Sequence, residues 1–129
     1  MPDTLYDTRF FLATYSRQAG LEQRVRSELQ TRKRKYASAI TIHEIYRIFL
    51  ETEGRDVAKI HKAAIERDFE IIDVDSEIAA ESAEIKVTSG RDFPLADAII
   101  GATAKLRGLV CFTDDEHIKA LSAVKTKWF

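Results

Sequence analysis

The sequence predicts an α/β protein, a three-layer α/β/α fold around a mostly parallel central sheet of about five strands. Five short apolar runs recur along the chain, at residues 4–7, 36–40, 70–74, 109–112 and 124–128. Longer segments with helical periodicity separate them, and strands that alternate with helices form a parallel sheet covered on both faces. A chain of 129 residues has room for one hydrophobic core, so we expect residues 1–129 to form a single domain.

Composition excludes several classes of protein. The chain is 45% hydrophobic and 32% charged, which is typical of a soluble globular protein, and it contains one cysteine, which excludes a disulfide framework. No apolar run approaches the ~20 residues of a membrane span. We expect no signal peptide, no membrane contact and a cytoplasmic location. The net charge of −1 argues against a generic polyanion binder, so any contact with nucleic acid must come from a local basic patch.

The first strand ends in an acid. A short helix is expected after it, and Asp7 then stands at the carboxyl end of the strand, although Asp7 followed by Thr8 is also a natural helix cap. A second helix is expected over residues 21–33, with Leu21, Val25 and Leu29 on one face. The basic run at its end, residues 31–35, is either a solvated helix terminus or an edge that contacts RNA phosphates.

The second strand leads into a helix with another acid near its start. Thr41 and Glu44 have the spacing of a capping box, so Glu44 either reaches back to the Thr41 amide or faces the end of the sheet. This helix runs to Gly54, and Asp56 caps a fourth helix. The third strand follows, and then a fifth helix that ends near Gly90.

A buried helix follows Pro94. Its apolar residues recur at helical spacing, at Leu95, Ala98, Ile99, Ala102 and Leu106. Asp97, in its first turn, either complements the helix dipole or serves a site. After the fourth strand, Thr113 and Glu116 have capping-box spacing, with Asp115 between them.

Four acids therefore lie on connections that meet at one end of the sheet. Asp7, Glu44 and Asp115 follow the first, second and fourth strands, and Asp97 opens the helix that leads into the fourth. Clustered carboxylates repel one another unless a cation lies among them, and oxygen ligands favour Mg²⁺ or Mn²⁺ over zinc. The histidines show no paired ligand spacing, and we expect all three at the surface or at an interface: His43, His61 and His117.

Four segments resemble the acidic signatures of PIN-domain nucleases, and the length is most similar to VapC-type toxins of toxin–antitoxin pairs. The segments are residues 6–8, 38–44, 95–104 and 113–115. The family pattern near the end is Thr-x-Asp with an aromatic residue three positions on, where this chain has Ile118. Asp114 is a second candidate for the fourth acid, and the spacing from Thr113 favours Asp115.

The resemblance implies a PIN-like fold and an Mg²⁺-dependent endoribonuclease, with Mn²⁺ as a substitute for Mg²⁺. Asp7 and Asp97 would hold the metal, Asp115 would complete the ligand set, and Glu44 would position or deprotonate the attacking water. Thr8 and Thr113 would hold the carboxylates by hydrogen bonds. Candidates for phosphate contacts are Arg9, Arg91 and residues 32–35.

The resemblance also implies an RNA substrate, a cognate antitoxin protein and a homodimer. Six aromatic or apolar residues are either an interface or plain core: Phe10, Phe11, Tyr15, Tyr46, Phe49 and Leu50. Two other functions stay open. One is a PIN-type RNA-processing nuclease without an antitoxin, and the other is an α/β domain that binds a metal without cutting RNA.

Overall fold

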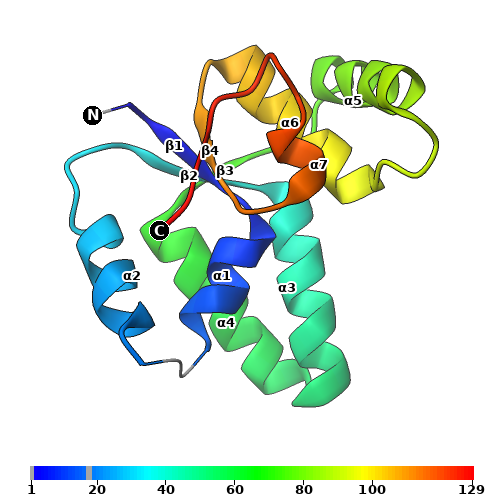
Figure 1. The fold of residues 1–129 in the computed structure, drawn as a ribbon. Helices are drawn as coiled ribbons and strands as arrows, with labels where there is room; N and C mark the ends of the chain where they lie inside the picture. The colour runs from blue at the N-terminus through cyan, green and yellow to red at the C-terminus, as the bar shows by residue number, and fades with distance from the viewer. Residues whose placement is uncertain (1, 17–18) are drawn as a thin grey trace.

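Five short parallel strands form the centre of the computed structural model, which describes residues 2–16 and 19–129 (Figure 1). Their order in the sheet is β3-β2-β1-β4-β5, and every neighbouring pair is parallel. The bounds are β1 Thr4–Tyr6, β2 Lys35–Ser38, β3 Glu70–Ile72, β4 Val110–Phe112 and β5 Thr126–Lys127. The prediction of an α/β fold with a parallel sheet is confirmed.

Helices cover both faces of the sheet, as Figure 1 shows, with α1 to α4 on one side and α5 to α7 on the other. Their bounds are α1 Thr8–Thr14, α2 Leu21–Leu29, α3 Ala39–Thr52, α4 Arg55–Asp68, α5 Ser76–Ser89, α6 Leu95–Arg107 and α7 Glu116–Lys119. None of the helices in the described part of the chain is long and apolar enough to cross a membrane.

The register of the sheet brings the ends of three strands together. Tyr6, the last residue of β1, pairs with Ala37 of β2 and with Phe112 of β4. The backbone N–H of Asp7 then donates a hydrogen bond to the Phe112 carbonyl at 3.1 Å. The residues that follow β1, β2 and β4 therefore start from one edge of the sheet, where the sequence predicts the four acids.

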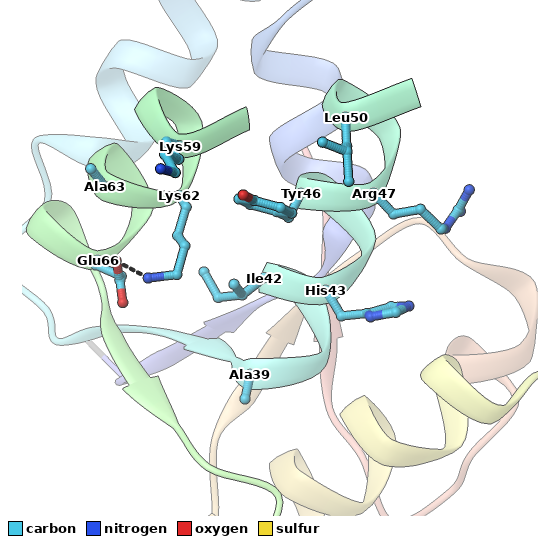
Figure 2. A pocket seen from close by; sticks show the side chains of 10 residues that line it. All are labelled: Ala39, Ile42, His43, Tyr46, Arg47, Leu50, Lys59, Lys62, Ala63 and Glu66. Atoms are coloured by element: carbon cyan, nitrogen blue, oxygen red, sulfur yellow. Dashed lines mark hydrogen bonds and ion pairs between the residues drawn. The ribbon is translucent and has the colours of Figure 1, made fainter. Parts of the chain in front are cut away.

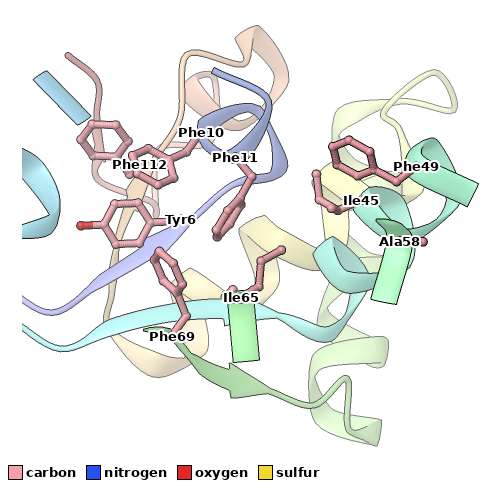
Figure 3. Packing of buried hydrophobic residues seen from close by; sticks show 10 residues of the cluster. Tyr6, Phe10, Phe11, Ile45, Phe49, Ala58, Ile65, Phe69 and Phe112 are labelled. Carbon is pink, nitrogen blue, oxygen red and sulfur yellow. The ribbon is translucent and has the colours of Figure 1, made fainter. Parts of the chain in front are cut away.

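The core beneath α1, α3 and α4 is rich in aromatic side chains (Figure 3). Phe10, Phe11 and Phe49 belong to it and are buried, so these three residues are core and not an exposed interface. Tyr15 and Leu50 remain 36% and 43% exposed. Of the residues that the sequence left open between core and interface, some are therefore core and others remain partly exposed.

Helix α6 is buried along most of its length, as predicted. All seven residues from 98 to 104 are buried. Gly101 permits a close approach, because a Cβ atom there would lie 2.6 Å from Leu121 Cδ1. The expected stripe is wrong at its ends, since Leu95 and Leu106 are 59% and 37% exposed.

Several predicted boundaries were wrong. The helix expected over residues 21–33 ends at Leu29, and its buried residue is Glu28, whereas Leu29 is 36% exposed. The second strand ends at Ser38, because the Ser38 side chain accepts a hydrogen bond from Ile40 N and starts α3 there. The third and fifth strands are also shorter than their apolar runs, since side-chain hydrophobicity continues beyond the last paired backbone groups.

Candidate active site

Asp7 lies at the carboxyl end of the central strand and is only 2% exposed. Thr113 Oγ1, from the loop after β4, donates a hydrogen bond to Asp7 Oδ2 at 2.7 Å. Asp7 holds the N-cap position of α1, but its side chain makes no capping hydrogen bond. The capping interpretation is therefore wrong, and the carboxylate is directed toward the loop after β4.

Glu44 lies on the second turn of α3 and is held from α1. Thr8 Oγ1 donates a hydrogen bond to Glu44 Oε1 at 2.5 Å, and the hydroxyls of Thr8 and Thr41 are hydrogen-bonded at 3.1 Å. The predicted capping box is wrong, because Ser38 caps this helix and Thr41 lies inside it. Thr41 is the third residue of α3 and so does not hold the N-cap position that a capping box with Glu44 requires.

Asp97 and Asp115 reach the same place from the other face of the sheet. Asp97 lies in the first turn of α6, and its side chain is 18% exposed, while that of Asp115 is 13% exposed. Asp115 Oδ2 accepts a hydrogen bond from Ile118 N at 3.0 Å, so Asp115 caps α7. The capping box expected between Thr113 and Glu116 is wrong, since Thr113 Oγ1 instead accepts a hydrogen bond from Asp115 N at 2.9 Å.

Asp114 is directed away from these acids. Its carboxylate forms an exposed ion pair with Arg9, whose side chain is 52% exposed. Asp115, the next residue, lies close to Asp97, because both contact one imidazole. The geometry therefore agrees with the spacing argument that favours Asp115 over Asp114. We call Asp7, Glu44, Asp97 and Asp115 the acid cluster.

His117 is exposed, as expected of a surface residue, and it also lies beside the acid cluster. Its Nδ1 is 3.5 Å from Asp97 Oδ2 and 3.6 Å from Asp115 Oδ2. One potential ligand atom from each of these three residues lies within 4.8 Å of the other two. His61, by contrast, stacks on the Phe49 ring with centroids 3.7 Å apart. The signal that the sequence offered was the placement of a histidine two residues after Asp115.

The electrostatics of Asp97 are those of a crowded anion. Burial raises the pKa of Asp97 to about 7, and the charges of Asp115 and Asp7 add to the rise. His117 acts in the opposite direction, and Glu44 adds a further small rise. Without a cation, this carboxyl therefore keeps its proton to a higher pH than an ordinary aspartate does.

Asp7 behaves in the same way. Burial raises the pKa of Asp7 to about 6, even though the hydrogen bond from Thr113 and a backbone hydrogen bond at Thr8 act to lower it. The charges of Asp115 and Glu44 also contribute to this rise in the pKa of Asp7. Two members of the acid cluster thus carry a free-energy cost for being ionised.

The donor set fits a divalent cation. Carboxylate oxygens are the ligands that Mg²⁺ and Mn²⁺ accept in proteins. Within the residues that the structure describes, the salt-bridge partner of Asp97 and Asp115 is His117, and neither pairs with a lysine or an arginine. A bound cation would stabilise the ionised forms of Asp7 and Asp97, whose pKa values are raised.

The predicted phosphate contacts lie in different places. Arg9 lies two residues after Asp7, and Arg91 is exposed shortly before α6, whose first turn carries Asp97, so both are near the carboxyl edge of the sheet. Residues 32–34 precede β2 and Lys35 is its first residue, so this run lies at the opposite edge. Within that run, the Lys33 side chain is 2% exposed and pairs with the buried Glu28, so the run is neither fully solvated nor part of the acid edge.

An apolar groove lies between α3 and α4, on a part of α3 that does not include Glu44 (Figure 2). Its volume is about 810 Å³. Figure 2 shows Ile42 and Tyr46 pointing from α3 toward α4, while His43 and Arg47 point to the other side. Lys62 on α4 pairs with Glu66 at 2.9 Å, so one side of the groove is charged.

Sequence comparison finds one family. The sequence model of the PIN domain matches residues 4–124. No curated protein matches the chain significantly.

Solved structures with similar folds include components of toxin–antitoxin complexes. A DNA-bound VapBC complex from Salmonella typhimurium contains a chain that is 20% identical, with a TM-score of 0.80 over 99% of this chain and 98% of that chain. FitAcB from Neisseria gonorrhoeae is 25% identical, with a TM-score of 0.75 over 95% of each chain. VapC20 from Mycobacterium tuberculosis, a toxin that cleaves the sarcin–ricin loop, is 17% identical, with a TM-score of 0.75 over 95% of this chain and 99% of that chain.

Proposed function

The chain belongs to the PIN domain family, and from this premise we propose that it is an Mg²⁺-dependent endoribonuclease, the toxin of a toxin–antitoxin pair. The observation that carries the proposal is the acid cluster, in which burial and neighbouring carboxylates raise the pKa values of Asp7 and Asp97. Such an arrangement is costly to the fold unless a cation is bound there.

Asp7, Asp97 and Asp115 would hold Mg²⁺, or Mn²⁺ in its place. When bound, the cation lowers the pKa of water and offsets the charge that builds on the scissile phosphate. Thr113 fixes one oxygen of Asp7, and the α7 N-terminus fixes one oxygen of Asp115, so neither carboxylate is free to rotate.

Glu44 is assigned to the attacking water. Thr8 holds its Oε1 by a hydrogen bond, which orients the carboxylate, and the side chain is only partly buried. In this position Glu44 orients the water and accepts its proton as the water attacks phosphorus, while the scissile P–O bond breaks and the leaving oxygen takes up a proton from solvent. Arg9 and Arg91, both exposed near the same edge, are assigned to flanking phosphates of the RNA.

The partner in this proposal is an antitoxin protein, and the functional unit is a homodimer of single PIN-like domains spanning residues 1–129, working in the cytoplasm. Support comes from the relatives solved as VapBC and FitAB complexes. The groove between α3 and α4, with Ile42 and Tyr46 on its wall, offers an apolar surface of the kind that partner chains cover.

The test is cleavage of a mixed cellular RNA pool by purified protein with Mg²⁺, Mn²⁺ or EDTA. We expect Asp97→Asn to lower the rate about 100-fold or more, because one carboxylate of the cluster is lost. Asp68→Asn is the matched control, since its exposed carboxylate pairs with Arg67 at the end of α4, outside the cluster, and it should retain the rate within about threefold. Cleavage that survives EDTA, or that Asp97→Asn leaves intact, would contradict the proposal.

A further inference from the structure

The imidazole of His117 lies between the two segments that deliver Asp97 and Asp115. Asp115 caps α7, and His117 follows it within that helix. The Phe93 ring packs edge-on against the imidazole, with centroids 5.4 Å apart and an interplanar angle of 66°. Phe93 is 5% exposed and leads directly into α6, which carries Asp97. The histidine is thus held by the same loop that positions one of its acidic neighbours.

The distances favour a shared ion over direct hydrogen bonds. A charge-assisted N–H···O bond measures about 2.7–2.9 Å, whereas His117 Nδ1 lies 3.5 Å from Asp97 and 3.6 Å from Asp115. Ligands about 2.1 Å from one cation are separated by roughly 3.0 Å in an octahedral site and about 3.4 Å in a tetrahedral one. The observed spacing is therefore close to that of neighbouring ligands of one ion.

We propose that His117 is a direct ligand, through Nδ1, of the divalent cation held by Asp97 and Asp115, and that this nitrogen makes the site prefer Mn²⁺ and Co²⁺ to Mg²⁺. The inference rests on the proposed metal site. Magnesium is a hard ion that takes oxygen ligands and keeps its waters, whereas imidazole nitrogen binds later first-row metals more strongly. An acid cluster without this histidine would give no such preference.

A competing role for His117 predicts the opposite result. A protonated imidazole would act as the counter-charge of the two carboxylates, and a cation would have to displace it. Removal of His117 would then strengthen cation binding. If His117 is a ligand, its removal weakens the binding of Mn²⁺.

The experiment measures Mn²⁺ binding to the RNA-free protein by electron paramagnetic resonance. In the wild-type protein, electron spin echo modulation from a directly bound ¹⁴N should be present, and it should change to that of ¹⁵N when histidine is ¹⁵N-labelled. His117→Ala should lose this signal and bind Mn²⁺ about tenfold more weakly or worse. Mg²⁺ affinity, measured by competition against Mn²⁺, should fall much less, by about threefold or under, because Mg²⁺ gains little from nitrogen.

Lys119→Ala, in the same short helix, is the matched control and should leave both affinities unchanged. The labelling arm needs no variant, so it decides the question even if His117→Ala is poorly folded. Mn²⁺ that binds in an Asp97-dependent way without a nitrogen signal would overturn the histidine ligand and leave the acid site standing. Tighter Mn²⁺ binding by His117→Ala would also overturn it, in favour of the counter-charge role. No Asp97-dependent Mn²⁺ binding at all would overturn the ligand and the proposed metal site together.

Discussion

Two sites with poorly exposed carboxylates meet at the end of strand β1. Tyr6, the last residue of β1, belongs to one site, and Asp7, the next residue, belongs to the other. Tyr6 OH donates a hydrogen bond to Glu28 Oε2 at 2.5 Å, whereas Asp7 belongs to the acid cluster. Glu28 also pairs with Lys33, which is 2% exposed, and with Lys127 at 3.4 Å. We call Glu28, Tyr6, Lys33 and Lys127 the Glu28 network.

The two sites differ in charge compensation and not in burial. Burial alone would raise the pKa of Glu28, but hydrogen bonds from Lys33 and Tyr6 outweigh it, and the net shift is downward. At Asp7 and Asp97, burial and neighbouring acids raise the pKa. The Glu28 network therefore contains its own cations, whereas Asp97 and Asp115 pair with no lysine or arginine in the described part of the chain. This difference separates a structural ion pair from a candidate functional site better than exposure does.

The largest effect on stability is expected from a substitution at Glu28. We expect Glu28→Ala to lower the free energy of unfolding by about 3 kcal/mol, because it leaves the buried ammonium of Lys33 without its partner. Urea unfolding measures this change. The double variant Glu28→Ala/Lys33→Met should recover much of the loss, since no buried charge remains unpaired. A loss under about 1 kcal/mol in the single variant would show that Lys33 reaches water on its own.

A divalent cation should have the next largest effect, and only at the acid cluster. At one hundred times its Kd, a bound ion stabilises the fold by about 2.7 kcal/mol. Thermal unfolding of the wild-type protein should therefore shift upward with Mn²⁺ concentration, while Asp97→Asn should respond far less. An equal upward shift in both proteins would place the stabilising ion elsewhere.

The two sites should respond to pH with opposite signs. Because folding raises the pKa of Asp97 from 3.8 to about 7, the folded state holds more protons, and this group's contribution falls as pH rises through that range. Glu28 has a lowered pKa, so its contribution is present above the ordinary value of 4.5 and is lost as pH falls below it. In EDTA, Asp97→Asn should gain about 1 kcal/mol over the wild type between pH 5 and pH 8. Asp114→Asn should follow the wild-type profile, and parallel profiles for Asp97→Asn would contradict the crowding argument.

Lys127 should matter least. It approaches Glu28 at 3.4 Å, but its side chain is 49% exposed. We therefore expect Lys127→Met to cost about 0.5 kcal/mol or less, a difference that urea unfolding at low and high salt measures. A cost as large as that of Glu28→Ala would mean that Lys127, and not Lys33, balances the buried carboxylate.

Local patterns predicted the parallel sheet and the meeting of the four acids. Each acid lies a few residues from an apolar segment, as Asp7 comes directly after the run that becomes β1. In a parallel sheet those steps end at one edge, so little long-range information is needed. The hydrogen bonds expected from Thr8 and Thr113 to the carboxylates are present for the same reason.

The partners of Glu28 and the approach of His117 to Asp97 could not be predicted from the sequence. Helical periodicity favoured Leu29 as a buried residue, but Tyr6 and Lys33 make Glu28 the buried one, and Lys127 is 99 positions away. The position of His117 is notable only because Asp97, on a different helix, lies close to it. Polar contacts between distant segments produce no periodic pattern in the sequence, and the contacts of Glu28 and of His117 are of this kind.

The order of the strands has a consequence for synthesis of the chain. Strand β1 is made first, yet it lies between β2 and β4, and the Thr113 hydroxyl that holds Asp7 is 106 residues further along. Loop closure over such a distance comes late in folding. A nascent chain that has reached residue 100 carries Asp7, Glu44 and Asp97 but lacks Asp115 and the Thr113 hydroxyl that holds Asp7. With the proposed activity, the acid cluster would thus be complete only after the ribosome had passed residue 115, which protects the message that encodes it until then.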